Sequence, residues 1–274
     1  MLIRLRDGLR LHVRDRGRGV PVVALHGFAG PSDAWDAAVA GLSATRRVVA
    51  IDLLGHGASD AAAVPDRYAM DNAIADVLDV MDALDLDRAA VVGYSMGGRV
   101  ALAAACHAPG RIHALVLESA SPGLPSDDER RDRRAADERL AADIGARGTE
   151  WFADHWSDLP LFETRQRLGP EVLAAVRRRL LANRPGCLAA CLRGLGAGAQ
   201  PPLWDALTRL TVPTLLLAGA DDTRFVEIAN RMHGLLPAAQ VSVIEDAGHT
   251  VHLEQPAQWQ RGVGTFLERH LPTR

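Results

Sequence analysis

The stretch "VVGYSMGGRV", residues 91–100, decides how the rest of the sequence is interpreted. Gly93-Tyr94-Ser95-Met96-Gly97 matches the pattern G-x-S-x-G, in which a sharp turn between a strand and a helix exposes a serine hydroxyl. An apolar run, residues 89–93, precedes the serine, and a helical pattern, residues 95–107, begins with it. Ser95 therefore stands in the context that such a turn requires, and it is a candidate for the reactive group of an active site.

Short apolar runs alternate with helical patterns along most of the chain. Most of the runs are continuous rather than alternating, which is typical of strands buried on both faces of a parallel sheet. They lie at residues 22–25, 48–51, 89–93, 114–118, 214–219 and 241–244. Helices are predicted between and after them, among them residues 68–86 and 257–270. This order, preceded by a β-hairpin around the Asp7-Gly8 turn, predicts an α/β fold with a doubly wound sheet.

The alternation breaks between about residue 121 and residue 207. This segment holds many charged residues and three of the tryptophans, Trp151, Trp156 and Trp204, and its apolar periodicity is helical throughout. We interpret residues 121–207 as a helical lid inserted into a core formed by residues 1–120 and 208–274. The glycine-rich stretch 195–202 is expected to be a flexible return to that core.

The composition excludes several classes of function. A formal net charge of -3 argues against a nucleic-acid partner, and no run of apolar residues is long enough for a membrane span. All 31 basic residues are arginine, so Schiff-base catalysis, covalent pyridoxal phosphate and a Walker A loop, which need a lysine, are excluded. The three cysteines, Cys106, Cys187 and Cys191, are expected to be reduced thiols in a cytoplasmic protein, and we expect neither a metal nor a cofactor.

A serine hydroxyl reacts only when a histidine takes its proton, and that histidine needs an orienting carboxylate. In this architecture the acid and then the histidine follow the serine along the chain. His249, directly after the last strand and its connection, is favoured over His252, which already leads into the final helix. Asp222, after residues 214–219, is the favoured acid, and Asp221 is the alternative.

Two backbone N–H groups are expected to form an oxyanion hole beside Ser95. Met96, the residue after the serine, supplies one of them. The other is expected from Phe28 in the loop "HGFAG", residues 26–30, where Gly27 lets the backbone come close. We expect His26 in the same loop to be structural.

Arg99 follows Ser95 by four positions, which places both on one face of a helix. Because helical side chains lean toward the N-terminus, Arg99 is expected to point back over the turn that carries Ser95. A guanidinium is costly to bury without an anion, and arginine binds a carboxylate through two parallel hydrogen bonds. Arg99 is therefore predicted either to bind an anionic substrate or to pair with an acid of the protein.

Five segments together resemble the α/β-hydrolase superfamily: "LHGFAGPSDAW", "DLLGHGASD", "GYSMGGR", "GADDTRF" and "AGHTVHLEQP". More narrowly, "GYSMGGRVALAAA", "ESASPGL", "WFADHWSDLPLF" and "LRGLGAGAQPPLW" resemble the 2-succinyl-6-hydroxy-2,4-cyclohexadiene-1-carboxylate synthases of menaquinone biosynthesis. The resemblance implies an α/β-hydrolase fold with a mostly parallel central sheet, flanking helices and a helical lid. It also implies a lyase that removes pyruvate from a cyclohexene polycarboxylate, a small-molecule partner.

The same resemblance implies further residues that contact the substrate. It places Tyr94, Arg133 and Trp156 in the site, and it implies one more arginine in the helix around "VRRRLLANRP". Spacing leaves Arg177, Arg178 and Arg179 open for that arginine, and we favour Arg179. In place of the lysine that is usual in the family's acid motif, this chain has Arg224.

Two other functions use the same sequence features. A carboxylesterase, a thioesterase or a carbon–carbon hydrolase would need the same serine, histidine and acid. A non-catalytic ligand-binding protein can retain them as well. The sequence leaves the oligomeric state open.

Overall fold

The computed structural model describes residues 1–62 and 64–271. Its centre is an eight-stranded sheet in the order β1-β2-β4-β3-β5-β6-β7-β8. The first two strands are antiparallel to their neighbours, and the other six are parallel to one another, because long helical connections separate them. The strands are β1 (Leu2–Arg4), β2 (Arg10–Arg16), β3 (Pro21–Leu25), β4 (Arg47–Ile51), β5 (Ala89–Tyr94), β6 (Ile112–Glu118), β7 (Thr214–Gly219) and β8 (Ala239–Ile244).

Each predicted apolar run coincides with a strand, so the predicted α/β class, the parallel sheet and the N-terminal hairpin are confirmed. Most side chains of the inner strands are buried whichever face they point to, which is why their sequences are continuously apolar.

Two layers of helices cover the sheet. One layer consists of α2 (Met70–Ala83), α3 (Met96–His107) and α8 (Thr223–His233), and its apolar side chains share one core with one face of the sheet. The other consists of α1 (Asp36–Val39), α9 (Val251–Glu254) and α10 (Pro256–His270), which pack against the opposite face around Trp35 and Trp259. The sheet is therefore buried on both sides, as the doubly wound pattern requires.

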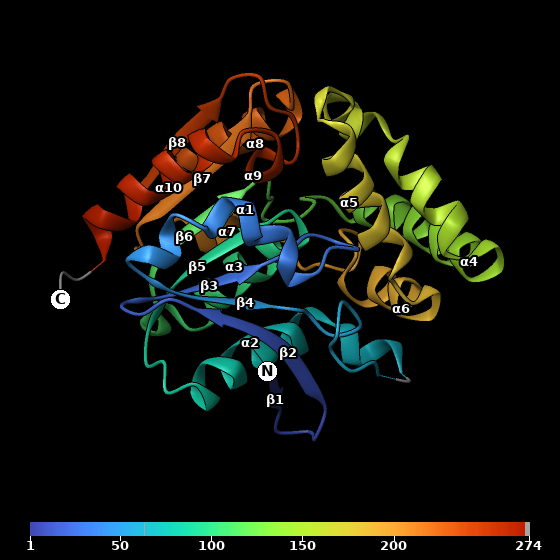
Figure 1. The fold of residues 1–274 in the computed structure, drawn as a ribbon, viewed down its shortest axis with the longest axis horizontal. Helices are drawn as coiled ribbons and strands as arrows, with labels where there is room; N and C mark the ends of the chain where they lie inside the picture. Colours follow the sequence, from blue (N-terminus) through green and yellow to red (C-terminus); the bar gives the residue numbers. More distant parts are fainter. Residues whose placement is uncertain (63, 272–274) are drawn as a thin grey trace.

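Most of the remaining helices lie beside the sheet, at the right of Figure 1. Residues 121–207, all of them described, contain no strand. They form α4 (Asp127–Ser157), the 3₁₀ helix η5 (Pro160–Arg167), α5 (Pro170–Leu181), α6 (Pro185–Leu195) and α7 (Trp204–Leu207). The first three α-helices share a small core of their own around Ile144, Phe152 and Leu188. Of the core expected from residues 1–120 and 208–274, residues 63 and 272–274 lie outside the described residues.

Residues 195–202, expected to be a flexible return, are closely packed in the structure. Gly198 lies against α4, where a Cβ atom would come within 2.5 Å of the Arg134 backbone nitrogen, and its carbonyl accepts a hydrogen bond from Arg134 Nη1 at 2.9 Å. Gln200 is 1% exposed. The glycines of this stretch therefore permit close packing.

Candidate active site

Ser95 sits on a strained turn between β5 and α3. Its φ of 50° lies in the left-handed region, which non-glycine residues rarely adopt. The turn is held by a hydrogen bond of 2.9 Å from the Ser95 N–H to the Glu118 carbonyl. A Cβ atom on Gly97 would collide with the backbone carbonyls of Leu25 and His26, so the glycine lets α3 begin directly against β3. The strain persists because the surrounding backbone fixes it, and it lifts the serine hydroxyl into a cavity.

The structure brings Ser95, His249 and Asp222 into one hydrogen-bonded chain. His249 Nε2 lies 3.1 Å from Ser95 Oγ, and His249 Nδ1 lies 2.6 Å from Asp222 Oδ2. Both His249 and Asp222 are buried. Asp222 is also the N-cap of α8, where its other oxygen accepts from the Phe225 N–H. A His249 tautomer with its proton on Nδ1 donates to Asp222 and leaves Nε2 to accept the serine proton.

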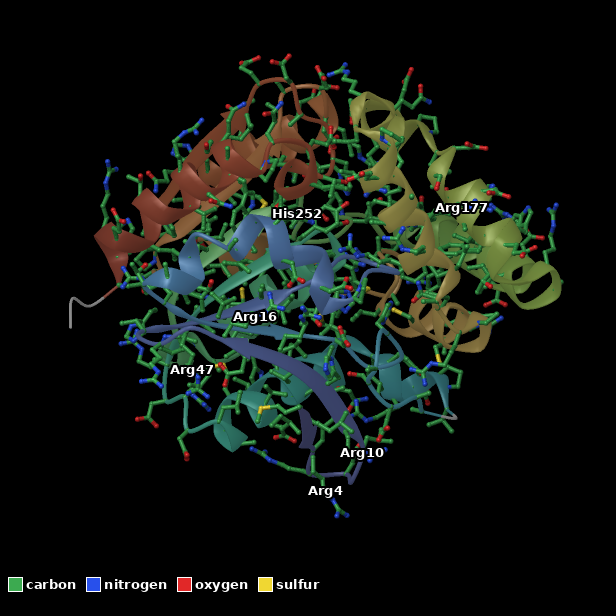
Figure 2. The ribbon with its side chains drawn as sticks, in the orientation of Figure 1. Arg4, Arg10, Arg16, Arg47, Arg177 and His252 are labelled. Atoms are coloured by element: carbon green, nitrogen blue, oxygen red, sulfur yellow. The ribbon has the colours of Figure 1, made fainter. Side chains whose placement is uncertain are left out.

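The two alternative residues of the sequence analysis have other partners. His252 Nδ1 lies 2.8 Å from Oε1 of Glu118, a fully buried carboxylate that also accepts from Trp259 Nε1 at 2.8 Å. His252 belongs to α9, is buried, and is labelled in Figure 2. Asp221 turns outward and pairs with Arg167 at 2.6 Å. Neither therefore reaches Ser95.

Phe28 and Met96 occupy the positions expected of an oxyanion hole. Phe28 lies in the loop after β3, and Met96 is the first residue of α3. Among the described residues, no acceptor bonds the backbone N–H of either one. The loop is supported from below by His26, whose Nε2 accepts from the Leu53 N–H at 3.0 Å and whose Nδ1 lies 2.7 Å from the Gly27 carbonyl. Burial lowers the pKa of His26, which keeps the ring neutral in this role.

A cavity of about 380 Å³ opens above Ser95 between the sheet and the helices of residues 121–207. Trp156 lines it and packs against Phe28 and Phe162, with ring centroids 5.2 and 5.6 Å away. Tyr94 forms part of the floor, and its hydroxyl lies 3.2 Å from Thr250 Oγ1. Burial raises the pKa of Tyr94 to about 12, although Arg165 opposes the shift, so the phenol is a neutral donor.

Arg99 points into this cavity one helical turn after Ser95. It forms no ion pair with any described acid. Its one hydrogen bond to a described side chain runs from Nη1 to Gln200 Oε1 at 3.1 Å, and that acceptor is neutral. Burial lowers the pKa of Arg99 to about 10, so the guanidinium is still charged at neutral pH. The alternative of an internal ion pair is therefore wrong, and the charge is available to an anionic ligand.

Arg133 and Arg179 also line the cavity, but each has an acidic partner. Arg133 Nε lies 2.8 Å from Asp137 Oδ1, and Arg179 Nε lies 2.7 Å from Asp33 Oδ1. The other two arginines that spacing left open lie elsewhere. Arg177, labelled in Figure 2, pairs with Asp154 of α4 in an exposed ion pair, and Arg178 lines a neighbouring cavity.

Three arginines at the cavity were not among the candidates for substrate contact. They are Arg165, Arg224 and Arg231. Arg224 stands where the family's acid motif usually has a lysine, and this position could have indicated that Arg224 lies at the site. Arg165 and Arg231 carry no such signal, because they reach the cavity through the packing of η5 and α8 rather than through a motif.

Other reactive groups at the cavity are inert or absent. Cys191 lines it, but burial raises the pKa of this thiol to about 12, so it stays protonated. Over residues 1–62 and 64–271, no cluster of histidine, cysteine and acidic side chains could hold a metal ion. Within the same ranges, the helices lack the combination of length and apolar character needed to cross a bilayer.

This chain is similar in sequence and in fold to several known proteins. Residues 20–256 match the alpha/beta hydrolase fold family. A Bacillus subtilis (strain 168) protein named for 2-succinyl-6-hydroxy-2,4-cyclohexadiene-1-carboxylate synthase activity is 39% identical over 97% of this chain and 97% of its own length. The synthase of the same name from Salmonella agona (strain SL483) is 35% identical over 87% of this chain and 90% of its own. The solved structure of MenH from S. aureus superposes with a TM-score of 0.90 at 32% identity, covering 96% of this chain and 99% of that one.

Proposed function

Because this chain belongs to the 2-succinyl-6-hydroxy-2,4-cyclohexadiene-1-carboxylate synthases, lyases of the α/β-hydrolase superfamily, we propose that it eliminates pyruvate with Ser95 as the base. The substrate is 2-succinyl-5-enolpyruvyl-6-hydroxy-3-cyclohexene-1-carboxylate. It carries one carboxylate on the ring, one on the succinyl arm and one on the enolpyruvyl arm. The observation that carries the proposal is a charged Arg99, unpaired by any described acid, one turn from a serine that is bonded to His249.

The reaction begins with removal of a proton. His249 accepts the Ser95 proton at Nε2 while Ser95 Oγ takes the proton from the ring carbon next to the succinyl ketone. Asp222 holds the ring of His249 and stabilises the imidazolium that forms. The electron pair of the broken carbon–hydrogen bond moves toward the ketone oxygen, where the N–H groups of Phe28 and Met96 stabilise the enolate.

The enolate then expels the leaving group. Its electrons return through the ring double bond, the carbon–oxygen bond to the enolpyruvyl arm breaks, and the 2,4-diene is formed. The released enolpyruvate takes up a proton and becomes pyruvate. No acyl-enzyme is formed, since Ser95 exchanges only a proton.

The cavity walls support this assignment of roles. Arg99, Arg133 and Arg179 place cationic groups around Ser95, and Tyr94 and Trp156 supply a neutral donor and an apolar wall. We also propose that residues 121–207 act as the lid of a core made from residues 1–120 and 208–274. The lid helices contribute Arg133, Trp156 and Arg179 to the cavity.

Pyruvate release tests the proposal directly. Purified protein is incubated with the enolpyruvyl substrate, and pyruvate is followed with lactate dehydrogenase. Ser95→Ala is expected to lose about 10³-fold or more in kcat, because the variant lacks the hydroxyl that acts as the base. Ser157→Ala, a lid serine bonded to the Ala153 carbonyl, is the matched control and should react like the wild type. Wild-type release no faster than that of Ser95→Ala would refute the proposal.

The same preparations separate this function from that of a carboxylesterase or thioesterase. An apolar acyl group has no negative charge, so it would not form an ion pair with the unpaired Arg99. Fast hydrolysis of p-nitrophenyl butyrate, together with turnover of the enolpyruvyl substrate that Arg99→Ala leaves unchanged, would favour the esterase instead.

A further inference from the structure

Arg165 reaches from the lid to the residue next to His249. It lies in η5, and its Nε and Nη2 atoms donate to Thr250 Oγ1 at 2.9 and 2.6 Å. Nη2 also lies 3.5 Å from the Tyr94 hydroxyl. The guanidinium is half-buried, lines the same cavity as Ser95, and takes no part in the hydrogen-bonded chain of Ser95, His249 and Asp222.

All the partners of Arg165 among the described residues are neutral. Besides Thr250 and Tyr94, its guanidinium carbon lies 3.8 Å from the centre of the Phe162 ring. The nearby acid Glu254 is engaged elsewhere, because its two oxygens accept from the N–H groups of Gly248 and Thr250. A cation that is partly removed from water and has no counter-charge is unfavourable in the free protein and attracts an anion.

Its neighbour Arg167 shows the contrast. That residue stands two positions later in the same 3₁₀ helix, is mostly exposed and pairs with Asp221 at 2.6 Å. The lid thus carries two arginines close together in the sequence. Arg167 is paired with an acid at the surface, whereas Arg165 has no acidic partner at the cavity. Of these two, only Arg165 lines the cavity that contains Ser95.

The orientation of Arg165 suits a carboxylate. Stacking on Phe162 fixes the plane of the guanidinium, and Nε and Nη2 are held by Thr250. Nη1 bonds to no described residue, and Arg165 lines the cavity, so the N–H groups of Nη1 are left to bind a ligand. A guanidinium that is already held in one plane loses little freedom when it binds a carboxylate.

The distribution of charge around Ser95 indicates which side of the substrate Arg165 serves. Arg133 and Arg179 are partly neutralised by Asp137 and Asp33. Arg99 approaches from the α3 side, where it meets Gln200, whereas Arg165 approaches from the side of His249 and Thr250. A substrate with carboxylates on separate arms therefore meets unneutralised cations on two sides of the base.

We propose that Arg165 is a specificity-determining residue that binds the substrate carboxylate on the His249 side of Ser95. This inference rests on the proposed pyruvate elimination and adds a binding residue to it. Arg165 selects for a substrate whose anionic arm extends past His249.

The test compares Arg165→Gln and Arg165→Lys with Arg167→Gln, the adjacent control. Arg165→Gln is expected to raise KM for the enolpyruvyl substrate about 10- to 100-fold with a smaller effect on kcat, because a charge-assisted hydrogen bond to the ground state is lost. Arg165→Lys should recover part of the loss. Arg167→Gln should stay within about twofold of the wild type, since its side chain lies outside the cavity.

Calorimetric titration with succinate, as a dicarboxylate probe, makes the test independent of turnover. Weaker succinate binding by Arg165→Gln than by Arg167→Gln supports the role of Arg165. If the wild type at the same time releases no pyruvate, the proposed function fails but the role of Arg165 in carboxylate binding stands. Wild-type KM and wild-type succinate binding in Arg165→Gln would overturn the role of Arg165. An equal fall in kcat for Arg165→Gln and Arg165→Lys, with unchanged KM and a lower thermal midpoint, would also overturn it and would indicate a structural tie between lid and core.

Discussion

Arg99 Nη1 donates a hydrogen bond to Gln200 Oε1 at 3.1 Å, so the cation beside Ser95 is held by an uncharged acceptor. Gln200 is buried, and it comes from the glycine-rich stretch 195–202. An amide oxygen orients a guanidinium without neutralising it. A carboxylate at the same place would form an ion pair and compete with an anionic substrate.

Gln200→Glu is therefore expected to be more harmful than Gln200→Ala, although it preserves more of the side chain. An internal ion pair with Arg99 should raise KM for the enolpyruvyl substrate about 10- to 100-fold, which corresponds to about 1.5–3 kcal/mol of competing charge-assisted bonding. Gln200→Ala should cost only severalfold through looser positioning of Arg99. Steady-state kinetics of the two variants checks the order. If the alanine variant has the higher KM, Gln200 acts by packing alone.

The choice between Asp221 and Asp222 is tested by a pair of isosteric changes. Asp222→Asn leaves His249 Nδ1 facing an amide and favours the wrong tautomer, so kcat should fall about 10³- to 10⁴-fold. Asp221→Asn removes only a surface ion pair with Arg167 and should change kcat less than about threefold. Both rates are measured by pyruvate release. Comparable losses in the two variants would contradict the assignment of Asp222 as the orienting acid.

Acid sensitivity of the fold is expected to depend on His56. Burial and the neighbouring His26 lower the pKa of His56 from 6.5 to about 3. Between these values the unfolded chain binds a proton that the native state does not, so the free energy of unfolding falls as the pH falls. The slope is about 1.4 kcal/mol per pH unit for one such histidine.

His56→Gln removes this proton uptake. Its free energy of unfolding, measured with urea, should therefore drop about 2 kcal/mol less than that of the wild type between about pH 7 and about pH 5. Because each protein is compared with itself at the two pH values, the pH-independent effect of the substitution on the free energy of unfolding cancels. Parallel losses in both proteins would show that His56 does not carry the acid sensitivity.

Much of the site could be predicted from the sequence because it depends on local rules. Ser95 lies in a turn that needs Gly97 for steric reasons, and such a turn joins a strand to a helix wherever it occurs. Asp222 and His249 follow the ends of β7 and β8, and parallel strands bring their carboxyl ends to one edge of the sheet. The strands could also be predicted from local sequence. A strand that is buried on both faces has a continuous run of apolar residues instead of an alternation of polar and apolar ones.

Contacts between residues 121–207 and the rest of the chain could not be predicted in this way. Gln200 meets Arg99 across 101 positions, and Arg165 meets Thr250 across 85. The pairing of Arg179 with Asp33 and the inward position of Arg165 depend on how irregular helices sit on the sheet. Hydrophobic periodicity fixes which side of a helix is buried, but it does not fix which distant side chain lies opposite.

The sequence by itself determined the α/β class, the positions of the strands along the chain, and Ser95, His249 and the favoured Asp222 as members of the hydrogen-bonded chain, because backbone sterics and burial act over a few neighbouring positions. Only the tertiary structure decided which arginines are neutralised and which keep their charge for a ligand. That outcome depends on the distance between each guanidinium and the nearest carboxylate, and such distances exist only after the helices of residues 121–207 have packed against the sheet and its loops.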